Sequence, residues 1–138
     1  MKYIPEILVT GLLLLAMGCN RPPASITGTW VFDIELTQQG NTPPLLSDEE
    51  IQQMTASPPP NIHFSYHGDC LVMITANHTN FLQISQFNAT SIFLHSDAAI
   101  SASNKVVIID HDTIFTEYSG VDRNGNPGVT REYLRRKK

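Results

Sequence analysis

Cysteine, charge and long apolar runs are all scarce in this chain of 138 residues. Its two cysteines, Cys19 and Cys70, allow one disulfide at most, and none if either thiol is modified. Charged residues make up 16% of the chain and the formal net charge is −4, so nothing marks a nucleic-acid binder. No apolar run reaches the roughly 18 residues that a membrane-spanning helix needs.

The sequence also lacks motifs for catalysis and metal binding. It contains no Gly-x-Ser-x-Gly elbow and no paired-carboxylate motif, so we expect neither an enzyme nor a cofactor. His63 and His67 lie about 13 Å apart on a predicted strand, too far to share a metal ion. Asp110-His111-Asp112 is typical of a turn, and the run from Asp122 lacks the Gly and Glu of a calcium loop.

The first 18 residues have the features of an export signal. Lys2 begins a short n-region, and an apolar stretch from Ile7 to Met17 follows it. Leu15-Ala16-Met17-Gly18-Cys19 resembles the lipobox of bacterial lipoproteins, in which the cysteine receives diacylglycerol and becomes the first residue of the mature chain. The resemblance implies stable anchoring, because several acyl chains hold a protein far better than one. Asn20 then favours the outer membrane, with the domain facing the periplasm.

Residues 19–25 are predicted to be the lipidated N-terminus and tether, residues 26–136 the domain, and residues 137–138 a basic tail. The first strand, over residues 26–35, places Ile26, Trp30 and Phe32 on one face. Alternation and turn signals predict seven more strands, with the inward face of residues 81–87 ambiguous. These strands span residues 61–67, 70–76, 81–87, 91–95, 105–110, 113–119 and 129–136, and a looser connection spans residues 97–104.

One short helix is predicted over about residues 48–56. Ser47 and Glu50 have the spacing of a capping box, and three prolines from Pro58 end the helix. Only Ile51 and Met54 give the helix an apolar face, so we expect a lid or a plug. Eight antiparallel strands suffice to close a barrel. We therefore expect an all-β, eight-stranded, antiparallel up-and-down β-barrel, with an open sandwich of the same strands as the alternative.

The segment Ile26-Thr27-Gly28-Thr29-Trp30 resembles the Gly-x-Trp opening of lipocalins and lipocalin-like lipoproteins. The resemblance implies that Trp30 packs across the closed end of the barrel. The run Thr130–Arg135 resembles the final strand of these proteins, which implies a basic partner at Arg135. Such a likeness concerns the fold and does not determine function.

Two side-chain features of the domain carry further expectations. Cys70 lies in a predicted strand, and we expect a buried, inert thiol. Five basic residues crowd the last eight positions, where we expect them to be solvated; contact with anionic lipid headgroups is the alternative. They are Arg131, Arg135, Arg136, Lys137 and Lys138.

Two functions stay open for this domain. The first is a monomeric, non-enzymatic binding module for a small apolar ligand or an envelope lipid, with Trp30, Phe32, Phe64 and Tyr66 lining or filling the barrel. The second is an interaction protein, such as a periplasmic inhibitor, an immunity protein or an accessory subunit of an envelope complex. Its contacts would come from residues 36–60 and 120–128. A filled interior favours the partner, and an open apolar mouth favours the ligand.

Replacing Cys19 with serine tests the anchor, because the acyl chains require the thiol. We expect Cys19→Ser to abolish metabolic labelling with palmitate and to leave an unprocessed precursor. Cys70→Ser is the matched control and should be labelled like the wild type. Normal labelling of Cys19→Ser would contradict the lipoprotein assignment.

Overall fold

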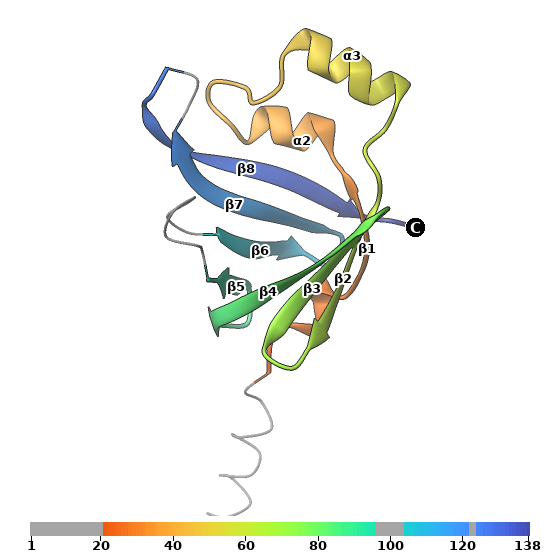
Figure 1. Cartoon of the computed structure of the whole chain (residues 1–138). Coiled ribbons are helices and arrows are strands. Elements are labelled where there is room, and N and C mark those ends of the chain that lie inside the picture. The colour runs from red at the N-terminus through yellow and green to blue at the C-terminus, as the bar shows by residue number, and fades with distance from the viewer. Residues whose placement is uncertain (1–20, 96–103, 122–123) are drawn as a thin grey trace, which may run out of the picture.

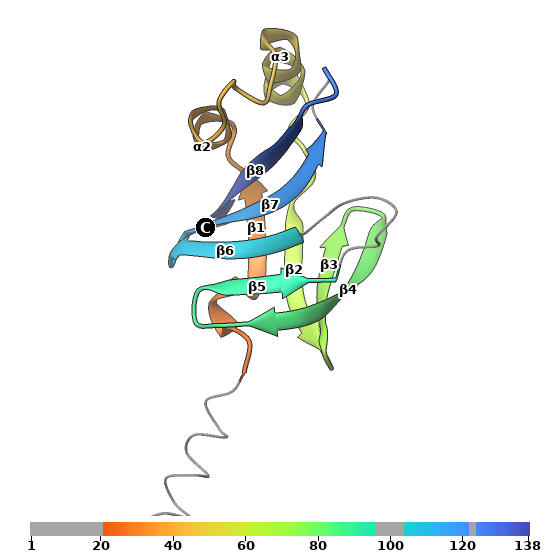
Figure 2. The same ribbon diagram turned by 90° about the vertical axis from the view of Figure 1, so that its left-hand side faces the viewer.

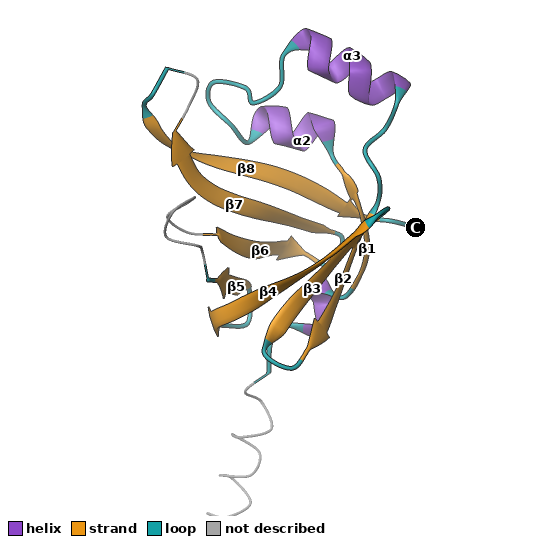
Figure 3. Ribbon diagram, viewed as in Figure 1, coloured by secondary structure: helices purple, strands orange, loops and turns teal. Residues whose placement is uncertain are grey.

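The computed structural model describes residues 21–95, 104–121 and 124–138, which form a closed eight-stranded antiparallel barrel in sequence order (Figures 1 and 3). The expected up-and-down barrel is thereby confirmed. The signal, Cys19 and the first two residues of the run from Asp122 lie outside the described residues. The strands are β1 (Gly28–Phe32), β2 (Ile62–His67), β3 (Cys70–Thr75), β4 (His78–Phe87), β5 (Ser91–Leu94), β6 (Asn104–Asp110), β7 (Thr113–Val121) and β8 (Pro127–Arg136).

The two ends of the barrel differ. The tether end carries residues 21–27, with the 3-10 helix η1 (Ala24–Ile26), and the turns that follow β2, β4 and β6. The helix end carries the β1–β2 connection, with α2 (Ile34–Gln39) and α3 (Asp48–Ala56), and the tip of the long β7–β8 hairpin (Figures 1 and 2). All strands lie within residues 28–136, so a chain that starts at Asn20 contains the complete barrel.

The first strand is shorter than predicted. We expected strand from residue 26 to residue 35, but β1 ends at Phe32 and Ile34 begins α2. The cause is Asp33, whose side chain accepts a hydrogen bond from the Leu36 amide at 3.0 Å and so caps a helix. The alternation of Ile34 with Phe32 fits a strand equally well, and the cap decides between the two conformations.

The predicted helix forms, but it does not plug the barrel. The Ser47 hydroxyl accepts the Glu50 amide at 3.1 Å, which confirms the first half of the capping box. No residue of α3 is buried, and both Ile51 and Met54 stay partly exposed. In Figure 1, α3 lies farther from the strands than α2 does. No helix among the described residues is long and apolar enough to cross a membrane.

A bulge in β4 resolves the ambiguous inward face. Leu82 and Ile84 pack against the core, and the register with β5 shifts between Ile84 and Gln86. One extra residue reverses the alternation, so Phe87 also packs against the core although its parity differs from that of Leu82. β4 also begins at His78, three residues before the start of the strand predicted over residues 81–87.

The core fills the tether-end half of the barrel. Trp30 is 0% exposed, and its indole N–H donates to the Ile26 carbonyl at 2.8 Å, so η1 closes this end. Eight buried side chains form one cluster: Ile26, Trp30, Phe64, Leu71, Ile92, Val106, Ile114 and Leu134.

Arg136 locks the first strand to the last. Its guanidinium lies 4.4 Å from the centre of the Trp30 ring and donates to the carbonyls of Ser25, Thr27 and His111. Gly28, with a φ of 128°, leaves the space that this group occupies. The basic partner expected at Arg135 is therefore Arg136, since successive residues of a strand face opposite sides. Arg135 lies 3.8 Å from Asp33 instead.

Helix α2 continues the edge contacts of β8 where β1 ends. The Thr37 hydroxyl, which is buried, accepts the Tyr133 amide at 3.0 Å. The Asn41 side chain accepts from the Arg131 amide at 3.0 Å and donates to the Arg131 carbonyl at 2.8 Å. Gly40 permits this approach, because a β-carbon there would overlap the Tyr133 ring. Side chains thus take the place of a strand along this edge.

Replacing Trp30 with alanine should lower the free energy of unfolding by about 3–5 kcal/mol, because it leaves a large cavity at the tether end. Urea denaturation of residues 20–138 measures this loss. Phe81→Ala is the matched control, since Phe81 is 61% exposed and its removal should change stability by less than about 1 kcal/mol. An unchanged midpoint for Trp30→Ala would contradict the closure described here.

Candidate functional site

The inner face of β6, β7 and β8 changes from apolar to polar towards the helix end. Near the tether end, Ile108, Ile114 and Leu134 are neighbours across the three strands. The next row towards the helix end consists of Val106, Thr116 and Glu132. The row after that consists of Asn104, Tyr118 and Thr130. Each inner position is two residues from the last, so all three rows share the face of the buried core.

Tyr118 and Glu132 form the centre of this polar region. They lie diagonally across β7 and β8, within reach of long side chains. Burial raises the pKa of Tyr118 well above its ordinary value, and the hydrogen bond to Glu132 and its negative charge raise it further. A hydrogen bond from Thr116 acts in the opposite direction, which indicates that Thr116 donates to the phenol and the phenol donates to Glu132.

Asn104 adds a buried acceptor to the same region. Its Oδ1 atom is fully shielded and has no hydrogen-bond partner among the described residues. Asn104 pairs with Tyr118 across β6 and β7, which places the two β-carbons about 5 Å apart. An unpaired buried acceptor is costly unless a water molecule or a ligand satisfies it.

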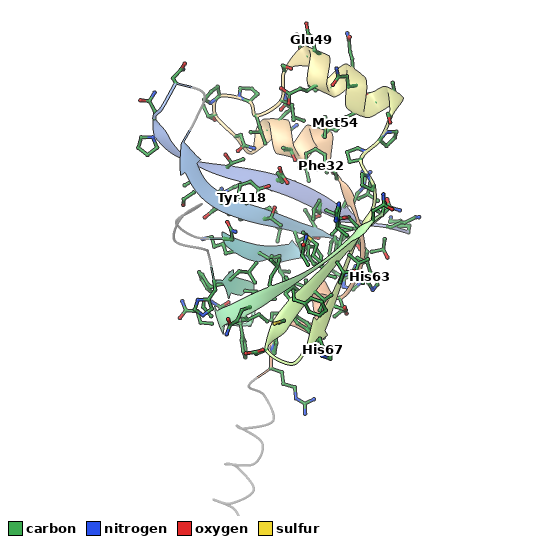
Figure 4. All side chains as sticks on the ribbon, in the orientation of Figure 1. Phe32, Glu49, Met54, His63, His67 and Tyr118 are labelled. Carbon is green, nitrogen blue, oxygen red and sulfur yellow. The ribbon has the colours of Figure 1, made fainter. Side chains whose placement is uncertain are left out.

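Apolar side chains that are only partly buried face this polar region from the other strands. Phe32 pairs with Leu134 across β1 and β8, and it is therefore the diagonal neighbour of Glu132. In Figure 4, Phe32 lies just below α2, and Tyr118 belongs to β7. Ile62, Met73 and Leu94 also pack against the buried core without being fully covered. The helix-end half of the interior thus has apolar side chains on one side and polar side chains on the other.

The four aromatic residues expected to line or fill the barrel divide between its two halves. Trp30 and Phe64 belong to the buried core. Tyr66 lies towards the tether end, where its hydroxyl donates to the Pro23 carbonyl at 2.7 Å. Phe32 alone of the four lies beside the polar region. Four residues of the polar region were not predicted from the sequence: Asn104, Thr116, Tyr118 and Glu132. The strand alternation carries a signal for three of them, because Thr116 and Tyr118 follow Ile114 by two and four residues and Glu132 precedes Leu134 by two.

The outer face contains two further clusters. Glu117 accepts from Arg131 at 2.8 Å and lies 3.2 Å from Lys105, while Arg131 also lies over the Phe115 ring at 5.0 Å. The expectation of a solvated basic C-terminus is wrong for Arg136, which is partly buried over Trp30, whereas the side chain of Arg131 pairs with Glu117 and is still 44% exposed. On β3 and β4, Ile74 is 40% and Phe81 is 61% exposed, and the ring of His67 meets that of Phe81 edge-on.

The remaining candidate groups show no catalytic geometry. Cys70 is partly exposed instead of buried; partial burial and the neighbouring Asp69 raise the pKa of its thiol, which disfavours the reactive thiolate. The Nδ1 atom of His63 lies 3.1 Å from the Thr29 hydroxyl. Within residues 21–95, 104–121 and 124–138, no three His, Cys, Asp or Glu side chains are placed to hold a metal ion.

Comparisons of the chain with models of protein families, with curated proteins and with solved structures gave no match.

Replacing Glu132 with glutamine should lower the pKa of Tyr118, because the variant removes the negative charge that opposes ionisation of the phenol. The pKa of Tyr66 should stay where it is, since burial alone raises it. Carbon-13 NMR of the tyrosine Cζ atoms during an alkaline titration distinguishes the two residues. A Tyr118 midpoint equal to that of the wild type would show that Glu132 does not contact the phenol.

Proposed function

We propose that this protein is a lipid-anchored, non-enzymatic binding module of the cell envelope that holds a small, largely apolar ligand in the helix-end half of its barrel. The observation that carries this proposal is the division of the interior. The tether-end half is filled by a buried core, whereas the helix-end half has partly exposed apolar side chains opposite a few polar ones. Small-molecule sites in proteins have this composition.

The position of the tether supports the same proposal. Arg21–Pro23 leads away from the end that Trp30 closes, and Tyr66 binds the Pro23 carbonyl there (Figure 1). An acylated Cys19 would stand two residues before Arg21 and would hold this end towards the membrane. The helix end would then face away from the membrane, in the periplasm for an outer-membrane lipoprotein, and would be accessible to a ligand.

A second candidate function is an interaction protein. The observation that favours it is the outer face of β3 and β4, where Val72, Ile74 and Phe81 are neighbours and the last two are substantially exposed. Exposed apolar patches of this kind occur at protein–protein interfaces. The loop residues first considered for contact, 36–60, include α3, which has no buried residue and offers a second surface.

Native mass spectrometry tests the first candidate. Residues 20–138, exported to the periplasm behind a cleavable signal, should carry a small molecule that is lost on denaturation. Phe32→Ser should reduce the fraction of loaded protein, because it removes the aromatic wall beside Glu132. Phe81→Ser makes the same change on the outer face and should leave loading intact. A bare wild-type monomer would contradict the proposal and leave the interaction protein as the better candidate.

A further inference from the structure

The helix-end interior contains a carboxylate that has no cationic partner in the described part of the chain. Glu132 takes the inward position next to Leu134, and the ion pairs of this region involve Glu117 and Asp33 instead. Arg131 and Arg135 lie one and three residues from Glu132 in the sequence, and residues an odd number of positions apart on a strand point to opposite faces. A partly desolvated carboxylate is stabilised by a nearby cation, and this one is placed to receive it from outside the chain.

Two acceptors of this region, the Glu132 carboxylate and the Oδ1 atom of Asn104, are placed to receive hydrogen bonds. Thr116 donates to Tyr118 and Tyr118 donates to Glu132, so this chain of hydrogen bonds ends on the carboxylate. The Oδ1 atom of Asn104, one row further towards the helix end, is another acceptor without a described partner. A ligand group that complements this arrangement must donate hydrogen bonds, carry positive charge, or do both.

Two aromatic rings flank the carboxylate. Phe32 on β1 and Tyr118 on β7 are both diagonal neighbours of Glu132, and their strands lie on opposite sides of β8. Aromatic faces attract ammonium groups, and this attraction is strongest where water is excluded. An anionic headgroup would be repelled by Glu132, and a neutral headgroup could donate a hydrogen bond to it but would lack the charge that strengthens both this bond and the attraction to the rings.

From this arrangement, we propose that the ligand is an organic ammonium ion with an apolar tail, whose ammonium group binds Glu132 between Phe32 and Tyr118. The tail lies against the partly exposed apolar side chains of the neighbouring strands, among them Ile62 and Leu94. This inference rests on the proposed function, since it specifies the headgroup of the ligand that the barrel holds.

Three amphiphiles with the same decyl chain test the headgroup. Decylammonium, decanol and decanoate are titrated below their aggregation concentrations into residues 20–138, with isothermal calorimetry or displacement of a fluorescent apolar probe as the measurement. Decylammonium should bind about tenfold or more tighter than the other two, as expected for a charge-assisted contact. Glu132→Gln should reduce decylammonium binding to the level of decanol and leave decanol unchanged.

Glu117→Gln is the matched control. It removes a carboxylate from the neighbouring strand, but on the outer face, and should retain the preference for decylammonium. Carbon-13 spectra of the wild type keep the test decisive if Glu132→Gln fails to fold. Decylammonium should then shift the carboxyl carbon of Glu132 and the Cζ of Tyr118 more than the same atoms of Glu117 and Tyr66.

The outcomes separate the two proposals. Equal affinity for all three headgroups, or a preference for decanoate, overturns the ammonium site and leaves an apolar binding module in place. Absence of binding by every amphiphile and by the probe overturns both. A preference for decylammonium that survives in Glu132→Gln shows that another group binds the cation and also overturns this inference.

Discussion

The contact between Arg136 and Trp30 is the interaction on which the rest of the barrel depends. A barrel closes only if its last strand finds its first, and here one guanidinium joins the chain before β1, the first strand itself and the β6–β7 turn. The same contact covers the indole, whose N–H is satisfied by Ile26. The same contacts therefore join β1 to β8 and close the tether end, and Gly28 leaves the space that the guanidinium needs.

This closure also decides which part of the interior is filled by apolar packing. Large side chains gather around Trp30, so the tether-end half is consumed by packing. Beyond Ile114 and Leu134, the inner positions of β7 and β8 are not part of this core, and polar residues occupy them. The barrel is thus divided along its length into a close-packed half and a half with polar inner positions.

Most of the fold could be predicted from the sequence because alternation and turns are local signals. The differences arose where a single side chain changed the outcome. Asp33 caps a helix where Ile34 continues a strand pattern, and one extra residue after Ile84 reverses the parity of β4. The site was harder to predict, because Glu132 is recognised as inward only once Leu134 is known to be buried. Charged residues are normally assigned to the outside of a strand.

The contacts of α2 with β8 make one edge of the sheet depend on side-chain identity. A strand covers its neighbour with backbone groups that every residue except proline has, whereas here Thr37 and Asn41 do so with a hydroxyl and an amide. The strand beneath them carries β-branched and aromatic residues, and an uncovered edge of this kind is a template for pairing with another chain. The covering of this edge is thus concentrated in a few positions of a short helix and the residues that follow it.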